Sequence, residues 1–253
     1  MFELPQTLPE GALLDRDALR LGRAVAETCG HWFRASAAAC LTGGAAHDAP
    51  VTAWQSTDGS AFLRPSEPNG GNTRFAANPR SGIVLRDGVH CGLWLSGATR
   101  QTSRRFSAAV IYSAPAGDPR TLLSLSTGQD QNLVFLSDAD GQLSLHDRAT
   151  GSGMDIPQPA RANGPHLAIL SHDGRELALQ GAGRTLRVTA DLPGMDRPGE
   201  LFVGCRSNRR GLLKTLGQAV IHDVFFWPDR AILLGDASPD LPGLLARHHL
   251  WAS

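Results

Sequence analysis

The chain has 253 residues, with 24 Lys or Arg and 24 Asp or Glu, so its formal charge at pH 7 is zero when the histidines are neutral. Such a balance provides no overall field to attract nucleic acid or an anionic membrane surface, and we expect neither as a partner. No segment approaches the roughly 20 apolar residues that a membrane-spanning helix needs, so membrane insertion is not expected. The length is sufficient for one large β-sandwich with a short appendage.

The N-terminal 25 residues contain neither the basic segment nor the apolar segment of a secretory signal peptide. We therefore expect synthesis in the cytoplasm without a signal peptide, and any release as part of a virion-like particle. The four cysteines, Cys29, Cys40, Cys91 and Cys205, lack the spacing of metal ligands. They are expected to be reduced and mostly buried.

Residues 1–50 are expected to form a helical attachment arm and linker outside the main domain. Apolar residues recur every three or four positions, which indicates one face of an amphipathic helix; they are Leu14, Ala18, Leu21, Val25, Cys29 and Trp32. Two roles for this helix remain open at this point. The apolar face packs on the chain's own domain, or it docks the domain onto another protein.

Residues 51–253 show the pattern of many short β-strands separated by turns. Short apolar or alternating runs recur as far as Trp227, and four Asp-Gly pairs at 58–59, 87–88, 140–141 and 173–174 lie between them. Asp-Gly is typical of hairpin turns that require a positive φ. This arrangement predicts a mainly β chain that forms an antiparallel sandwich or barrel. The segment from Thr150 to Pro165 shows no periodicity and is expected to be a long loop.

Four segments in the last hundred residues occur in an order that can be compared with that of known β-sandwich proteins. They are HLAILSHDGRELALQGAGRTLRV at 166–188, GELFVGC at 199–205, GQAVIHDVFFWP at 217–228 and LLARHHLW at 244–251. This series resembles the laminin-G-like branch of the concanavalin A-like lectin/glucanase superfamily. The resemblance implies a concanavalin A-like antiparallel β-sandwich, or jelly roll, over residues 51–253, closed by a short C-terminal helix. The same fold serves lectins, glycosidases, adhesion modules and virion fibres, so it leaves function open.

Catalysis of glycoside hydrolysis is not expected. That reaction needs two carboxyl groups at a defined separation, and the glucanases of the superfamily carry them as Glu-x-Asp-x-Glu or a close variant. This sequence has no such motif, and Glu176 and Glu200 stand alone. It also lacks the Gly-x-Ser-x-Gly elbow of a nucleophilic hydrolase. We therefore predict that the protein is not an enzyme and needs no cofactor.

A run of polar residues after the GELFVGC segment is the main candidate for ligand binding. Three arginines and one asparagine occur within five residues, and they are Arg206, Asn208, Arg209 and Arg210. Guanidinium groups bind carboxylate and phosphate groups through paired hydrogen bonds. The cluster therefore predicts a site for an acidic ligand, although a solvated loop or a subunit contact would have the same composition.

One Asp-Gly turn is a candidate metal site. Asp138 and Asp140 place two carboxylates around it, and some laminin-G-like modules bind calcium at their rim. Ca²⁺ takes six to eight oxygen ligands, so two carboxylates alone are too few. An ordinary hairpin turn is the alternative.

These features together favour a non-enzymatic binding module that recognises a surface polysaccharide, with a preference for acidic ones. A protein partner would bind through the N-terminal arm, in an oligomer or a larger assembly. The spike or fibre of a phage, or of a phage-like gene transfer agent, would fit this combination. A carbohydrate-active enzyme with an atypical site and a purely structural scaffold protein are the alternatives.

Overall fold

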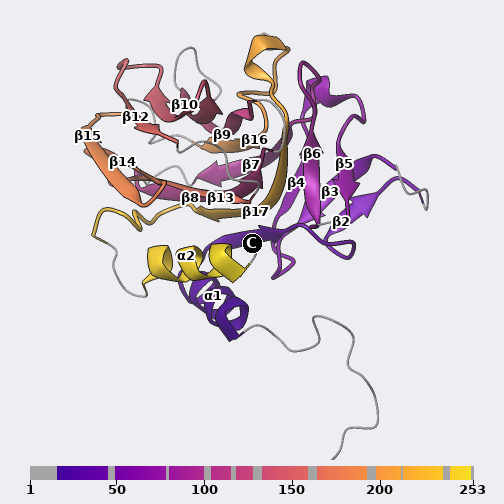
Figure 1. Cartoon of the computed structure of the whole chain (residues 1–253), viewed down its shortest axis with the longest axis horizontal. Helices are drawn as coiled ribbons and strands as arrows, with labels where there is room; N and C mark the ends of the chain where they lie inside the picture. Colours follow the sequence, from indigo (N-terminus) through magenta and orange to yellow (C-terminus); the bar gives the residue numbers. More distant parts are fainter. Residues whose placement is uncertain are drawn as a thin grey trace, which may run out of the picture.

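The computed structural model describes residues 16–44, 49–77, 80–99, 104–114, 118–127, 133–158, 164–192, 198–211, 213–235 and 240–251. Two antiparallel sheets face each other, and two helices cover one of them (Figure 1). The expected β-sandwich with an N-terminal and a short C-terminal helix is thus confirmed. None of the described helices is long and apolar enough to span a bilayer.

The back sheet is the one that carries the helices. Within the described residues it runs β15 (Arg184–Thr189), β14 (Glu176–Gly181), β13 (His166–His172), β8 (Phe106–Ser113), β17 (Ala219–Trp227), β6 (Gly82–Leu85) and β5 (Arg74–Ala76), with β1 (His31–Arg34) also paired to β17.

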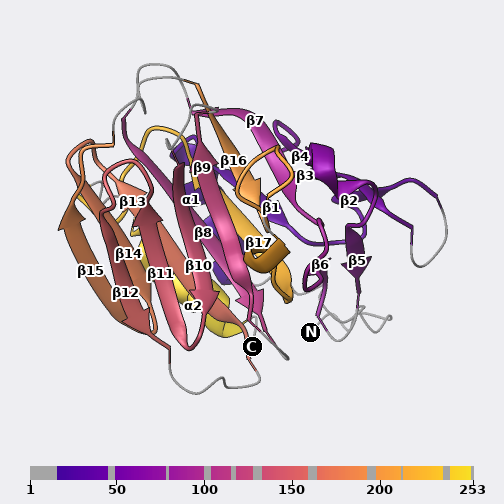
Figure 2. The same cartoon turned by 90° about the horizontal axis from the view of Figure 1, so that it is seen from above.

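The front sheet lies opposite. Its described strands run β12 (Gly153–Pro157), β11 (Gln142–Asp147), β10 (Leu133–Ala139), β9 (Arg120–Ser126), β16 (Gly199–Val203), β7 (Leu93–Thr99), β4 (Phe62–Pro65), β3 (Val51–Gln55) and β2 (Cys40–Thr42). Figure 2 shows the strands from β12 to β7 crossing the molecule in this order. Short 3-10 helices lie at Glu67–Asn69 and Leu213–Thr215.

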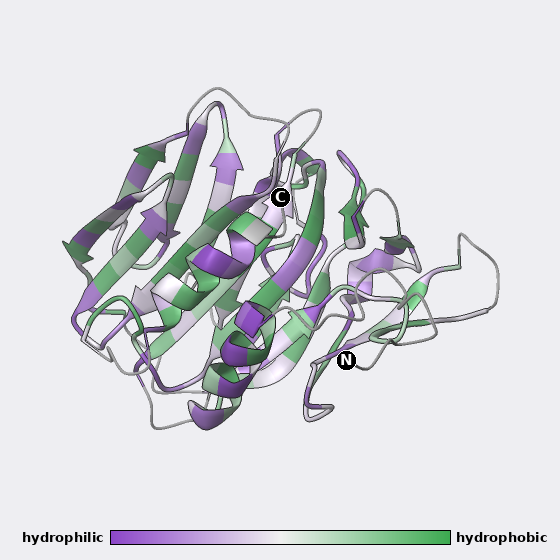
Figure 3. Cartoon of the chain, turned by 60° about the horizontal axis from the view of Figure 1, so that its bottom comes forward, coloured by the Kyte–Doolittle hydropathy of each residue, from purple (hydrophilic) through white to green (hydrophobic). Residues whose placement is uncertain are grey.

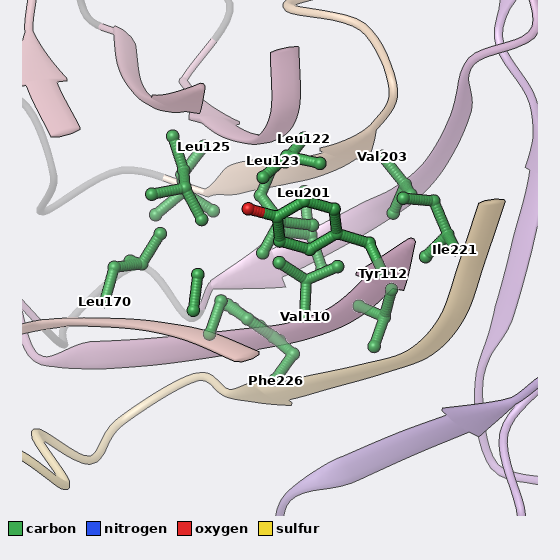
Figure 4. Close-up of a cluster of buried hydrophobic side chains, with 14 of the residues drawn as sticks. Val110, Tyr112, Leu122, Leu123, Leu125, Leu170, Leu201, Val203, Ile221 and Phe226 are labelled. Atoms are coloured by element: carbon green, nitrogen blue, oxygen red, sulfur yellow. The ribbon is translucent and has the colours of Figure 1, made fainter. Parts of the chain in front are cut away.

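The core fills the space between the two sheets. Val110, Tyr112 and Phe226 project into it from the back sheet, and Leu123 and Leu201 meet them from the front sheet (Figure 4). All five are almost completely buried. Each large apolar side chain contributes about 1.5–3 kcal/mol on burial, so this layer is the main source of stability.

The four Asp-Gly pairs lie in turns between strands, as expected. Gly59, Gly88, Gly141 and Gly174 all have φ between 65° and 102°. A side chain at these positions would strain the backbone, which explains the glycines.

The N-terminal helix α1 (Arg16–Glu27) packs on the outer face of the back sheet beside the C-terminal helix α2 (Leu241–Trp251). Leu21 and Val25 are buried against Phe225 and Trp227 of β17 and against Leu245 of α2. Figure 3 shows both helices lying across the outer face of the back sheet. The apolar face of this helix therefore packs on the chain's own domain, which is the first of the two roles considered above. Leu14 lies outside the described residues.

Two expectations about chain organisation need correction. Residues 31–42 belong to the sheets, because β1 pairs with β17 and β2 pairs with β3, so the region before residue 50 is not all arm and linker. Trp32 matches the helical spacing but lies in β1, where pairing with β17 outweighs the local periodicity. The expected loop from Thr150 to Pro165 contains β12, because Met154 and Ile156 alternate inward and are buried.

The cysteines are all free thiols. Cys40, Cys91 and Cys205 are buried, and burial raises the pKa of Cys40 to about 11 and that of Cys205 to about 12. Cys29 follows α1 and is exposed.

Candidate ligand-binding face

The outer face of the front sheet presents a row of side chains that are in register across six strands. From β11 to β4 the row contains His146, Phe135, Ser124, Phe202, Trp94 and Arg64. Their sequence neighbours, such as Leu145, Leu136 and Leu93, are buried in the core. Alternation along each strand therefore turns this row away from the core.

Aromatic rings contact each other at two places in the row. Trp94 and Phe202 are stacked, with ring centroids 6.3 Å apart and planes 13° from parallel. Phe135 and His146 lie 5.8 Å apart. Phe202 is fully buried, whereas Trp94 and Phe135 are partly exposed. A partly exposed aromatic residue thus lies on either side of a buried centre.

The loop from β16 to β17 covers that centre and stands above the front sheet in Figure 1. Cys205 and Leu216 of the loop pack on Phe202. The Ser124 hydroxyl, on β9, donates a 2.9 Å hydrogen bond to the Arg206 carbonyl oxygen. Gly204 begins the loop with φ of 71°, a conformation that side chains rarely adopt. The loop is thus fixed over the sheet.

Arg206 is held in place by this arrangement. Its guanidinium carbon lies 3.8 Å from the centroid of the Phe135 ring, a cation–π contact. Its Nε donates a 3.2 Å hydrogen bond to Thr121 Oγ1. Burial and the nearby charge of Arg148 lower the pKa of Arg206. An anion bound here would stabilise the charged form of Arg206 and so offset both effects.

A cationic depression of about 330 Å³ lies beside Arg206. Its polar and charged lining comes from three separate turns or loops, and comprises His90, Arg148, Arg206, Ser207, Arg209 and Thr215. No Asp or Glu lines it among the described residues. We call it the cationic depression.

The other two predicted residues of the arginine run are placed differently. Asn208 is partly buried, and its Oδ1 accepts a 2.9 Å hydrogen bond from the Glu67 backbone N–H. Arg210 is exposed and lies outside the residues that line the depression. The structure therefore brings Arg206 and Arg209 together with Arg148 and His90, which the sequence did not single out.

The candidate metal turn is arranged in a way that does not favour metal binding. The Asp138 side chain points into the core, where the Tyr112 hydroxyl donates a 2.7 Å hydrogen bond to its Oδ2. Asp140 is exposed in the turn, with φ of 52°. The two carboxylates thus face different environments. No group of three or more potential ligands is found among the described residues.

A second depression, of about 390 Å³, lies at the other end of the row. Phe62, Arg64, Trp94 and Ser96 contribute to its wall from β4 and β7. We call it the aromatic depression. This depression was not predicted from the sequence, although the alternation of Leu93 and Leu95 around Trp94 indicates that Trp94 points outward.

The two glutamates considered for catalysis lie on different sheets. Glu176 is on β14, in the back sheet. Glu200 is on β16, opposite Ser126 and two residues before Phe202. Burial and repulsion by Glu67 raise the pKa of Glu200. A partly buried carboxyl group of raised pKa therefore lies near the row of outer-face residues.

No protein-family model and no curated protein sequence matches the chain. Similar solved structures include a Trypanosoma rangeli sialidase with 2,3-difluorosialic acid (13% identity, TM-score 0.57, 92% of this chain and 38% of that one). Its complex with sialic acid gives 14% identity and a TM-score of 0.55, over 86% of this chain and 33% of that one.

A third similar structure is domain 4 of AbnA, a GH43 extracellular arabinanase from Geobacillus stearothermophilus, with arabinotriose. The identity is 13% and the TM-score 0.53, over 76% of this chain and 92% of that one. The chain spans only about a third of the sialidases' length, but nearly the whole of this arabinanase domain. These likenesses show a shared β-sandwich fold.

Proposed function

We propose that the protein is a non-enzymatic binding module that recognises a surface glycan on the outer face of the front sheet. The observation that carries this proposal is a partly exposed ring, that of Trp94, on the same sheet face as Arg206, whose guanidinium group is held over Phe135. Aromatic faces provide apolar contact area for the C–H faces of sugar rings. Guanidinium forks bind oxygen atoms with defined geometry.

The cationic depression supports a preference for acidic glycans. Arg148 and Arg209 are exposed, and Arg206 is held by its contacts with Phe135 and Thr121. Affinity for an acidic glycan should fall as salt is added, because exposed charges are screened beyond about 8 Å at physiological ionic strength.

The similar structures lend general support. The similar sialidase structures are complexes with sialic acid and with a difluoro derivative of it, and the AbnA domain is in complex with arabinotriose. All of these ligands are saccharides, so a saccharide is the first class of ligand to test. A laminin-G-like assignment within the broader fold remains part of this proposal.

The test is binding to a panel of acidic and neutral polysaccharides by calorimetry or glycan array. Replacing Arg148 and Arg209 together with Ala should weaken binding of an acidic glycan by at least about tenfold, which is 1.4 kcal/mol. Replacing Arg210 and Arg175, which are also exposed arginines, should change the dissociation constant less than about twofold. Equal effects of the two double variants would contradict a site at the cationic depression.

A glycoside hydrolase is the second candidate, favoured by one observation. The raised pKa of Glu200 is what a general acid requires, and Glu67 is the charged neighbour that contributes to it. Under our main proposal, the protein releases no reducing ends from any polysaccharide that it binds. Hydrolysis by the wild type that disappears in Glu200→Gln, while binding persists, would establish the enzyme instead.

Presentation on a virion-like spike or fibre is the final part of the proposal. The chain would be made in the cytoplasm and would join a protein partner through the exposed side of α1, where Leu19 is 50% exposed and Arg20 and Arg23 face solvent. Co-purification with particle proteins would support this presentation.

A further inference from the structure

We propose that the cationic depression binds a phosphate monoester carried by a sugar unit, so that the acidic ligand of the protein is a phosphorylated glycan. This inference rests on the proposed glycan-binding function and specifies the acidic group of the ligand. Three properties of the depression carry it, namely its positive charges, the hydrogen-bond donors that they leave unused, and its size.

The positive charges of the depression have no acidic counterpart in its lining. Arg148, Arg206 and Arg209 line it, and no Asp or Glu does so among the described residues. Arg148 is close enough to contribute to the lowered pKa of Arg206. Within the described part of the chain, neither of these two arginines forms an ion pair. Like charges held close together without a counterion repel each other, so the arrangement suits an anion of high charge.

Charge distinguishes a phosphate group from the other acidic groups of glycans. A carboxylate or a sulfate ester brings a single negative charge, whereas a phosphate monoester carries about −1.5 to −2 at pH 7. A phosphate therefore offsets more of the guanidinium charge than either alternative. It also presents three acceptor oxygens, whereas the two oxygens of a carboxylate are matched by a single guanidinium fork.

The available donors belong to separate parts of the chain, which suits a tetrahedral group. Arg148 lies in the turn that follows β11, whereas Arg206 and Ser207 lie in the loop from β16 to β17. Arg206 donates through Nε to Thr121, and its two terminal nitrogens donate to no described residue. The Ser207 Oγ accepts the backbone N–H of Arg209 at 3.3 Å, which leaves the hydroxyl hydrogen available to a ligand.

Arg206 is held in place before an anion arrives. Its guanidinium carbon lies 3.8 Å from the centroid of the Phe135 ring, and the bond to Thr121 fixes the other end of the group. A side chain that is already fixed loses little conformational freedom on binding. The free terminal nitrogens can therefore bind phosphate oxygens without the usual cost of ordering an arginine.

The size of the depression limits how much of the glycan is recognised. Its volume of about 330 Å³ is at the lower end of the range of about 300–1,000 Å³ for small-molecule sites. That volume suits one phosphorylated sugar unit rather than a longer segment. We therefore expect affinity to depend on the phosphate group and little on the length of the glycan.

The test compares dextrans that differ only in their substituent. Phosphodextran, dextran sulfate and carboxymethyl-dextran of equal chain length and equal degree of substitution are titrated against the full chain by calorimetry, with unsubstituted dextran as the neutral reference. At one ionic strength, phosphodextran should bind at least about tenfold more tightly than the other two charged forms. Glucose 6-phosphate should displace it at least as well as phosphoserine does.

Two variants and a matched control locate the effect. Arg148→Ala leaves the fork of Arg206 in place, so it should weaken phosphodextran at least about tenfold and carboxymethyl-dextran less than about threefold. Arg206→Lys keeps the charge but removes the fork, and should weaken both. The Arg175/Arg210 double Ala variant removes exposed arginines outside the depression and should keep the phosphate preference. Melting temperatures establish that each variant is folded.

The outcomes separate this inference from the proposed function. Equal affinity of the wild type for phosphodextran and either other charged dextran would overturn the phosphate assignment, as would an Arg148→Ala variant that keeps the full preference. Phosphoserine displacing phosphodextran better than glucose 6-phosphate does would indicate a phosphoprotein ligand and overturn the glycan part. If no charged dextran binds, this inference fails, whereas the polysaccharide panel described above decides the proposed function by itself.

Discussion

At the scale of single residues, Asp223 is a buried ionisable group of the back sheet with several partners. It is fully buried on β17 and accepts a 2.8 Å hydrogen bond from the Trp32 indole N–H. His248 of α2 and Arg80 each place a nitrogen 3.5 Å from its Oδ2. His248 is 4% exposed and packs against the Trp32 ring. Asp223 thus connects β1, β17 and α2.

This environment makes stability depend on pH in a defined direction. Burial alone would raise the pKa of Asp223, but His248, Trp32 and Arg80 together hold it below its usual value. A carboxyl group with a lowered folded-state pKa stabilises the protein above its unfolded pKa of about 3.9, and that contribution is lost as the pH falls through the folded pKa.

We therefore expect Asp223→Asn to cost about 3 kcal/mol at pH 7, as for other broken buried ion pairs, and to flatten the loss of stability below about pH 4. Urea unfolding from pH 2 to 7 measures the free energy of unfolding at pH 7 and its dependence on pH. Asp58 and Asp173 also have lowered pKa values and contribute acid dependence to both proteins, so the difference between the curves isolates Asp223. Asp191→Asn, at an exposed pair with Arg104, is the control and should change little. Parallel curves for Asp223→Asn and the wild type would disprove the assignment.

At the scale of elements, the sequence allowed two interpretations of α1. The helix could pack on the chain's own domain or dock onto another protein. Its apolar face completes a second small core with α2 and the outer face of β17. The periodicity of Leu21, Val25 and their neighbours predicted the helix correctly. It could not show which surface covers the helix, because a partner protein and the chain's own sheet require the same apolar face.

Two leucines of α1 provide a matched test of this packing. Leu21 is fully buried and Leu19 is 50% exposed, one turn or less away on the same helix. Leu21→Ala should cost about 2–4 kcal/mol in the free energy of unfolding, because it leaves a cavity against β17. Leu19→Ala should cost less than about 0.5 kcal/mol. A small cost for both would mean that the helix does not contribute to the stability of the sandwich in solution.

At the scale of the whole molecule, the fold was more predictable than the site. Alternating apolar residues and Asp-Gly turns depend on local physics, so they indicated the sandwich from sequence alone. The cationic depression depends on His90, Arg148 and Arg206, which come from turns more than 50 residues apart. No local pattern reports such proximity. Arg206 and Arg209 were predicted as site residues because they lie in one arginine-rich run. Arg210 belongs to the same run but does not line the depression.

The position of Cys29 has a practical consequence for measuring these properties. Cys29 is the one exposed thiol of the four in the sequence, and it comes two residues after the end of α1, the helix that packs on the outer face of the back sheet. A maleimide-activated surface would therefore attach every molecule through the Cys29 thiol. The front sheet would then face the solution in a single orientation, which allows surface-based affinity measurements without engineered tags or random amine coupling.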